Sequence, residues 1–141
     1  MKIGIIGLGD IAQKAYLPVI TQLPNVELVF CTRDAKTLSS LAQQYRIKES
    51  CQDYRQLPAF GVDAVMIHAA THVHFQIAEY FLKQSIPTFV DKPLADSAQQ
   101  VEQLYEIAAI ANQPLYVALI ADTFRSTTTI CQTYKKAMSL I

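Results

Sequence analysis

Residues 3–12 read Ile-Gly-Ile-Ile-Gly-Leu-Gly-Asp-Ile-Ala, and this stretch decides how the whole chain is interpreted. Residues 2–6 form a short apolar run that predicts a buried strand, and helical spacing of apolar residues starts soon after the last glycine. Between the two elements, Gly7, Gly9 and Ala12 fit the pattern G-x-G-x-x-G/A. The pattern stands where a strand turns into a helix.

Each small residue of this motif has a physical role. The first glycine permits a tight turn, the second lets a pyrophosphate approach the backbone, and the third small residue lets the helix pack closely on the strand. The N–H groups that open the helix, at Asp10 and Ile11, would face the anion together with the positive end of the helix dipole. The strand before the motif and the helix after it favour a dinucleotide site over an ordinary tight turn.

The composition is that of a globular chain long enough for one domain. Of 141 residues, 51% are hydrophobic and 17% are charged, which excludes a mainly disordered chain. Basic and acidic residues balance at 12 each, so the charge does not support a nucleic-acid or membrane-surface partner, and no apolar run reaches the roughly 20 residues of a membrane span. The chain opens directly on a strand, so we expect no signal peptide and a cytoplasmic protein. Cys31, Cys51 and Cys131 are then reduced thiols and not a disulfide framework or a zinc site.

Strand-like and helix-like segments alternate along the chain. The predicted strands cover residues 2–6, 26–31, 62–67, 87–90 and 115–119, and the predicted helices cover 11–23, 35–45, 72–83 and 97–112. Pro18 would kink the first helix or start a second one, and residues 46–61 show only a helical turn at 54–57. The alternation predicts an α/β fold, a doubly wound parallel sheet of the Rossmann type. Ligands bind beyond the carboxyl ends of such strands, so the strand exits should carry the chemistry.

The exit of the second predicted strand bears on cofactor choice. An acidic residue there would bind the ribose 2′-hydroxyl of NAD, whereas this chain offers Thr32 and Arg33 with Asp34 just beyond. A hydroxyl and a guanidinium suit a 2′-phosphate, which favours NADP. The alternative is that Arg33 is a solvated loop residue and that Asp34 takes the acidic role, which would favour NAD.

His68, His72 and His74 lie within seven residues of one another after the third predicted strand. Neutral imidazoles can bind zinc, but residues two apart point to different sides of a helix or strand, so we expect no metal site. The functional interpretation is that the loop Ala69–Thr71, with His74, packs against the nicotinamide or its ribose. The structural alternative is a helix cap at Thr71, with the histidines as satisfied polar contacts.

The sequence Asp91-Lys92-Pro93 follows the fourth predicted strand. A lysine ammonium at that position can bind ribose hydroxyls or a substrate oxygen, and can polarise a carbonyl or relay a proton. Asp91 would hold the lysine in place and keep it charged, and Pro93 fixes the turn, with a cis bond as one option. The alternative is a surface ion pair at a bend.

These segments together resemble the NAD(P)-dependent oxidoreductases of the family that includes glucose–fructose oxidoreductase and inositol dehydrogenase. The resemblance covers residues 1–117 and rests on Gly7-Leu-Gly-Asp-Ile-Ala12, on Asp63-Ala-Val-Met-Ile67, on His74 four residues before Ala78, and on Val90-Asp-Lys-Pro-Leu94. The family usually has Glu-Lys-Pro in the last motif. The aspartate variant, with Ile67-His-Ala-Ala-Thr71 before it, is similar to a branch labelled virulence-factor oxidoreductases, which indicates no particular substrate. The resemblance implies a Rossmann domain that binds NAD(P), with Lys92 near the nicotinamide and substrate. It also implies a second α/β domain that carries most of the substrate site and usually a catalytic histidine.

The sequence departs from this family after the last predicted strand. The family typically continues Gly-Phe-Asn-Arg-Arg, whereas this chain reads Ala118-Leu-Ile-Ala-Asp-Thr-Phe-Arg125 and then a threonine-rich stretch. Residues 117–125 can be back-translated so that a shifted frame gives Gly-Phe-Asn-Arg-Arg-His-Ile-Pro, the expected continuation. We therefore expect residues 1–117 to form the Rossmann domain, the second domain to be absent, and residues 118–141 to be an atypical tail. Out-of-frame sequence, an unrelated natural tail and an engineered truncation remain alternative explanations of the tail.

The functional hypothesis is the NAD(P)-binding domain of an oxidoreductase that transfers hydride between nicotinamide and a sugar-like or other small carbonyl or polyol substrate, inactive when alone. The alternative is a stand-alone nucleotide-binding module that regulates a partner without catalysis. The expected partners are a small molecule and, in a homo-oligomer, a second copy. Lys92 is the predicted catalytic residue, supported by Asp91. The predicted cofactor site comprises Gly7, Gly9, Asp10, Ile11, Ala12, Thr32, Arg33, Ala69, Ala70, Thr71, His74, Asp91, Lys92 and Pro93.

Overall fold

The computed structural model describes residues 1–118, so the predicted tail lies outside the described residues except for Ala118. The strands are β1 (Lys2–Ile6), β2 (Glu27–Cys31), β3 (Glu49–Cys51), β4 (Ala64–Ile67), β5 (Thr88–Val90) and β6 (Leu115–Val117). The helices are α1 (Leu17–Ile20), which follows a π-helical turn at Ala12–Tyr16, then α2 (Ala35–Tyr45), a 3-10 helix at Tyr54–Phe60, α3 (Thr71–Lys83) and α4 (Ala98–Ala111).

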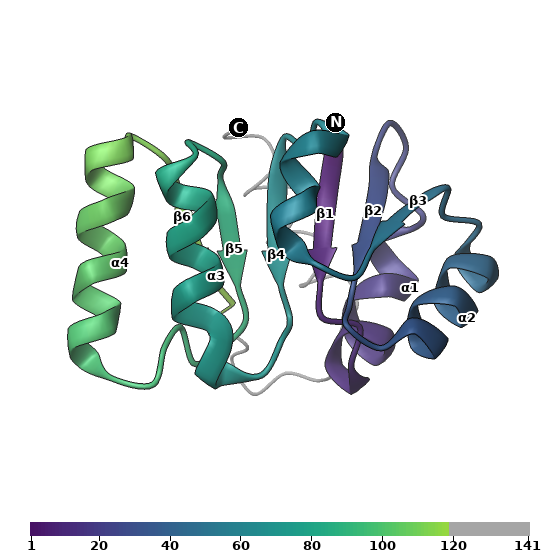
Figure 1. Cartoon of the computed structure of the whole chain (residues 1–141), viewed down its shortest axis with the longest axis horizontal. Helices are drawn as coiled ribbons and strands as arrows, with labels where there is room; N and C mark the ends of the chain where they lie inside the picture. Colours follow the sequence, from purple (N-terminus) through teal and green to yellow (C-terminus); the bar gives the residue numbers. More distant parts are fainter. Residues whose placement is uncertain (119–141) are drawn as a thin grey trace.

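The described strands form one parallel sheet in the order β3-β2-β1-β4-β5-β6. This is the strand order of a doubly wound Rossmann fold. Successive strands are added toward one edge from β1 to β3 and toward the other edge from β4 to β6, so the topological switch point lies between β1 and β4. The carboxyl ends of the strands lie together at the lower edge of the sheet in Figure 1. The predicted fold class is therefore confirmed, and the predicted site falls at one edge of one sheet.

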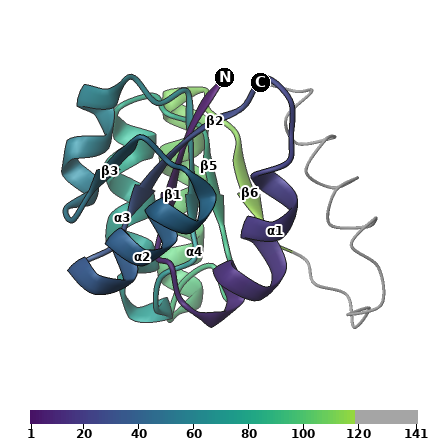
Figure 2. The same cartoon turned by 90° about the vertical axis from the view of Figure 1, so that its right-hand side faces the viewer.

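The sheet separates two apolar layers, and β1 shows how. Ile3 and Ile5 belong to the layer under α1 and α2, whereas Ile6 belongs to the layer under α3 and α4. Successive side chains of a strand point to opposite faces, so a central strand covered on both faces is apolar throughout. Figure 2 shows α1 and α3 on opposite sides of the sheet. At Gly4 the Leu57 side chain covers the strand, because a Cβ on Gly4 would lie only 3.0 Å from it.

The first helical segment is continuous over residues 10–20, but it is not the regular α-helix that the periodicity predicts. A π-helical turn precedes α1, and the Leu17 N–H donates to the Ala12 carbonyl across five residues. Pro18 stands in the first turn of α1, where its missing N–H is not needed. Residues 10–20 are helical throughout, so Pro18 lies just after the change from π-helical to α-helical hydrogen bonding and does not start a separate helix. A π turn inserted in a helix often marks a functional site, and this one ends at Tyr16.

The sequence patterns locate helices α2 and α4 correctly but miss strand β3. Helix α2 has the predicted bounds, and α4 is capped by Ser97, whose hydroxyl accepts a hydrogen bond from the Gln100 N–H. Strand β3 was not predicted, because Glu-Ser-Cys has no strand pattern of its own. Pairing with β2 creates it, and Lys2 holds Glu49 through a 2.7 Å ion pair. Cys31 and Cys51 are paired across β2 and β3 as free buried thiols, whereas Cys131 lies outside the described residues.

Candidate functional site

A hollow of about 300 Å³ opens at the carboxyl edge of the sheet beside the glycine loop. Six of the predicted cofactor residues line it, namely Gly7, Gly9, Thr32, Arg33, Ala69 and Ala70. The other lining residues are Ile6, Leu8, Cys31, Gln52, Tyr54, His68, Val73, Gln76 and Ile77. The structure thus brings together the exits of β1, β2, β3 and β4. The remaining predicted residues do not line this hollow.

The glycine loop is built so that its first two glycines have different tasks. Gly7 has a φ of +86°, and a Cβ there would lie 2.6 Å from the Ala69 backbone nitrogen, so only glycine fits. The Gly7 N–H donates to the Cys31 carbonyl at 2.9 Å, which fixes the turn against β2. A Cβ on Gly9 would meet nothing within 4 Å, so this glycine faces open space. The third small residue, Ala12, is fully buried against its neighbours.

The helical segment begins directly at the loop, at Asp10 and Ile11. The first N–H groups of a helix have no intrahelical acceptor, so these groups are available to an anion. The exposed Asp10 carboxylate lies 2.7 Å from Lys14, and this hydrogen bond lowers the pKa of Asp10. Lys14 therefore balances the negative charge that Asp10 would otherwise present to a phosphate.

Thr32 and Arg33 lie at the β2 exit, as predicted, and line the hollow. The backbone here is held by β3, because the Thr32 N–H donates to the Cys51 carbonyl and Gln52 Nε2 donates to the Arg33 carbonyl at 2.8 Å. Gln52 was missed by sequence reasoning because β3 was missed.

Asp34 caps α2, with its carboxylate accepting a 2.6 Å hydrogen bond from the Thr37 N–H. This hydrogen bond lowers the pKa of Asp34. The carboxylate is thus engaged by the helix, which weakens the alternative in which it binds a ribose.

His74 joins the exits of β4 and β5. Its side chain is 1% exposed, with Nε2 at 2.7 Å from the Ala69 carbonyl and Nδ1 at 2.9 Å from the Pro93 carbonyl. Both partners are acceptors, so both contacts are hydrogen bonds only when both ring nitrogens carry a proton. Ala70 is the N-cap of α3 and no side chain caps this helix, so the predicted cap at Thr71 is wrong.

A second polar cluster lies beneath the β4 and β5 exits and was not predicted. The Tyr16 hydroxyl donates to Asp91 Oδ1 at 2.8 Å, and His68 Nδ1 lies 2.8 Å from Asp91 Oδ2. The Tyr16 and His68 rings stack with centroids 4.1 Å apart. These contacts of the Asp91 carboxylate with Tyr16 and His68 were not predicted from the sequence. Burial and the negative charge of Asp91 raise the pKa of the Tyr16 hydroxyl far above its ordinary value.

Lys92 and Pro93 follow this cluster as exposed residues joined by a cis peptide bond. The β5 exit therefore places the exposed Lys92 next in sequence to the buried Asp91. Within residues 1–118 there is no cluster of three or more His, Cys, Asp or Glu side chains that could hold a metal ion. In the same part of the chain, no helix is long and apolar enough to cross a membrane.

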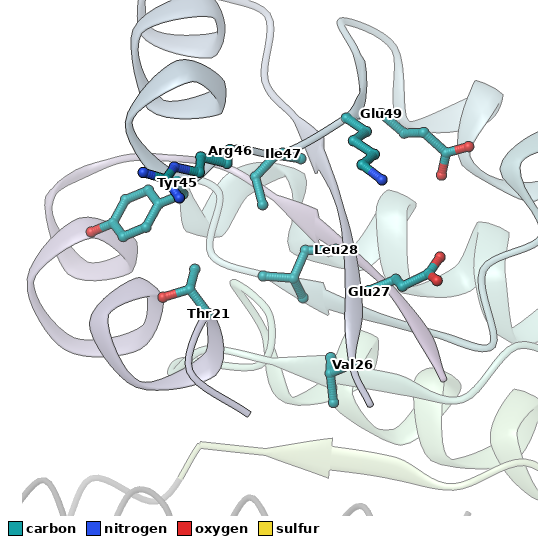
Figure 3. A pocket seen from close by; sticks show the side chains of 9 residues that line it. Thr21, Val26, Glu27, Leu28, Tyr45, Arg46, Ile47 and Glu49 are labelled. Carbon is teal, nitrogen blue, oxygen red and sulfur yellow. The ribbon is translucent and has the colours of Figure 1, made fainter. Parts of the chain in front are cut away.

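A second hollow, of about 360 Å³, lies at the opposite edge of the sheet. Figure 3 shows Leu28 and Ile47 in its middle, with Tyr45 and Arg46 on one side and Glu49 on the other. These residues stand at the start of β2 and between α2 and β3. None of them belongs to the predicted cofactor site, so the carboxyl edge remains the candidate functional site.

This chain is similar in sequence and in fold to known proteins. The family model described as "Oxidoreductase family, NAD-binding Rossmann fold" (Gfo/Idh/MocA) matches residues 1–119. YceM of Salmonella typhimurium is 35% identical over 113 residues, which are 77% of this chain and 35% of that protein. A Gfo/Idh/MocA family oxidoreductase from Vibrio cholerae is 62% identical with a TM-score of 0.82, over 83% of this chain and 38% of that one.

An oxidoreductase from Agrobacterium radiobacter, whose crystals contain NAD+, L-tartaric acid and magnesium, is 25% identical with a TM-score of 0.76. The match covers 82% of this chain and 34% of that one. The chain therefore spans little more than a third of the length of these relatives. On the evidence of the family match, the strand order and the glycine loop, the chain belongs to the Gfo/Idh/MocA oxidoreductase family and forms its NAD-binding Rossmann fold.

Proposed function

We propose that this chain is the cofactor-binding part of an oxidoreductase that transfers hydride between a nicotinamide and a small carbonyl or polyol substrate. The observation that carries the proposal is the contrast between the two loop glycines. Gly7 is locked against the Ala69 backbone, whereas Gly9 faces open space at the start of a helix. A pyrophosphate fits there, because it can approach a backbone without a Cβ and meet the free N–H groups of the helix.

The β2 exit supports NADP in preference to NAD. Thr32 and Arg33 line the hollow where the adenosine ribose of a dinucleotide would lie, and Arg pairs well with phosphate oxygens. Asp34 is occupied as the cap of α2, so the usual acidic partner of a ribose 2′-hydroxyl is engaged elsewhere. The NAD+ in the Agrobacterium radiobacter relative keeps NAD as the competing candidate.

Lys92 is proposed as the group that acts on the substrate oxygen. Bound NAD(P) would supply the hydride chemistry, and the lysine ammonium would polarise a carbonyl oxygen or stabilise an alkoxide beside it. Lys92 is exposed at the β5 exit, where a substrate can reach it. The L-tartaric acid in the Agrobacterium radiobacter relative supports a small polyhydroxylated substrate. The substrate-binding residues that complete such a site would come from a second domain, so we expect little turnover by this chain alone.

The test is direct titration of the purified chain with NADPH, NADH, NADP+ and NAD+, followed by turnover assays with sugars, polyols and hydroxy acids. Saturable binding of a dinucleotide, tighter for the 2′-phosphorylated forms, supports the proposal. Absence of binding for all four would refute it. Binding without turnover fits both a cofactor domain and a stand-alone nucleotide-binding module, and fusion to the second domain of a family member separates them, because only the former gains activity.

A further inference from the structure

Tyr16, His68 and Asp91 form a cluster that the proposed function does not yet use. Each of the three residues is 4–6% exposed, and each stands next to a different part of the proposed site. Tyr16 ends the π-helical turn that follows the glycine loop, His68 directly precedes Ala69, and Asp91 directly precedes Lys92. One buried carboxylate therefore ties together the three segments that would surround a nicotinamide.

Each oxygen of the Asp91 carboxylate has one polar neighbour in this cluster. The Tyr16 hydroxyl donates to Oδ1, and burial raises the pKa of this hydroxyl further above neutral pH. His68 presents Nδ1 to the same carboxylate. With a proton on Nδ1, the imidazole and the hydroxyl supply one hydrogen bond to each oxygen of Asp91.

His68 carries a polar atom that folding alone does not explain. Its Nε2 is buried and has no hydrogen-bond partner in the described part of the chain. Buried polar atoms are nearly always paired, so an unpaired one is unusual in a folded protein. The imidazole packs against the Tyr16 and Phe89 rings, with centroids 4.1 and 6.2 Å away, and this packing holds the ring for its Nδ1 contact.

We propose that Tyr16 and His68 are positioning residues that act through Asp91 to hold the β5 exit, and with it Lys92, in the geometry that binds the nicotinamide half of the cofactor. The inference rests on the proposed function and adds two residues to it. In the proposed site the adenosine half would lie against Thr32 and Arg33 at the β2 exit. Tyr16 and Asp91 do not line that hollow whereas His68 does, so Tyr16→Phe is the cleaner of the two tests.

The experiment compares a dinucleotide with the same molecule lacking only its nicotinamide. The ligands are NADP+ and 2′-phospho-ADP-ribose, or NAD+ and ADP-ribose if the wild-type chain prefers NAD. The ratio of their dissociation constants isolates the contribution of the nicotinamide. The emission of bound NADPH or NADH, which reports the surroundings of the reduced ring, gives a second readout, and melting temperature reports stability.

The variants remove one donor at a time. Tyr16→Phe deletes the hydroxyl and keeps the ring, His68→Leu deletes the N–H, and His68→Asn restores an N–H at nearly the same place. Tyr45→Phe is the matched control at the opposite edge of the sheet. We expect Tyr16→Phe and His68→Leu to weaken dinucleotide binding roughly tenfold, the usual effect of losing a hydrogen bond to a charged group, with less than about twofold change for the truncated ligand. His68→Asn should recover most of the loss, and Tyr45→Phe should change neither ligand.

Four outcomes overturn the inference. Equal weakening of both ligands would show that the cluster only supports the fold, and no weakening of either would show that it does not position the site. Equal affinity of the wild-type chain for the two ligands would show that no nicotinamide half is formed, while dinucleotide-site binding itself would stand. Failure of the wild-type chain to bind either ligand would refute the proposed function, and this inference with it.

Discussion

Replacement of Gly7 by alanine tests the central feature of the site. The left-handed backbone at Gly7, with φ at +86°, costs a residue with a Cβ about 1–2 kcal/mol. The added methyl group would also lie 2.6 Å from the Ala69 nitrogen and 2.7 Å from the His68 carbonyl carbon, both of which are backbone atoms that cannot rotate away. We therefore expect Gly7→Ala to lower the free energy of unfolding by about 2–4 kcal/mol.

Gly9→Ala is the matched control, because a Cβ there meets nothing within 4 Å. Its free energy of unfolding should stay within about 0.5 kcal/mol of wild type. The methyl group would instead occupy the space that we assign to a pyrophosphate, so dinucleotide affinity should fall by at least about tenfold.

The assay is urea denaturation followed by circular dichroism, combined with cofactor titration of each variant. Gly7→Ala should lower the free energy of unfolding, whereas Gly9→Ala, two residues away, should lower the affinity for the dinucleotide. If Gly7→Ala unfolds at the same urea concentration as wild type, the argument from the close Ala69 contact is wrong. If Gly9→Ala binds dinucleotide as tightly as wild type, the pyrophosphate does not lie where we place it.

Arg33→Asp should weaken NADPH binding at least about tenfold and leave NADH binding nearly unchanged, because a carboxylate repels a 2′-phosphate but can accept a hydrogen bond from a ribose hydroxyl. Equal losses of affinity for both cofactors in parallel titrations would exclude the proposed contact of Arg33 with the 2′-phosphate. Leu57→Ala should lower the free energy of unfolding by about 2–5 kcal/mol, since this fully buried side chain fills the space beside Gly4, and a loss below 1 kcal/mol in denaturant titrations would contradict that packing. The pKa of Asp34 is lowered in the folded state, so its contribution to stability is present above the unfolded-state pKa and is lost as the pH falls through the folded-state pKa. The melting temperature of wild type should therefore fall faster than that of Asp34→Asn between neutral pH and about pH 3, and parallel curves would contradict the linkage.

The sequence was sufficient for elements whose signal is local. Helix α2 carries an amphipathic pattern behind an aspartate cap, and α4 carries one behind Ser97, so both could be located from their own residues. The glycine loop could also be predicted from its own residues. Its motif specifies, within six residues, a tight turn, a backbone that a pyrophosphate can approach, and close packing of the helix on the strand.

The features that could not be predicted depend on distant parts of the chain. Strand β3 exists because β2 and Lys2 hold it, and its three residues carry no strand pattern. The cluster beneath the β5 exit joins Tyr16 to Asp91, which are 75 residues apart, and His68 to Asp91, which are 23 apart. Hydrophobic periodicity says which face a residue lies on, but it does not say which polar side chains meet there.

The contact between Gly7 and Ala69 also bears on how quickly a ligand can enter. It joins the exits of β1 and β4, which belong to the two halves of the sheet on either side of its switch point. Backbones packed this closely cannot slide past each other without breaking the His68 N–H bond to the Ile6 carbonyl, which is 2.7 Å long. The entry edge for a pyrophosphate is thus already assembled before any ligand arrives. Encounter should then be limited by diffusion and orientation and not by a slow opening step, so binding transients should follow a single exponential whose rate rises linearly with ligand concentration.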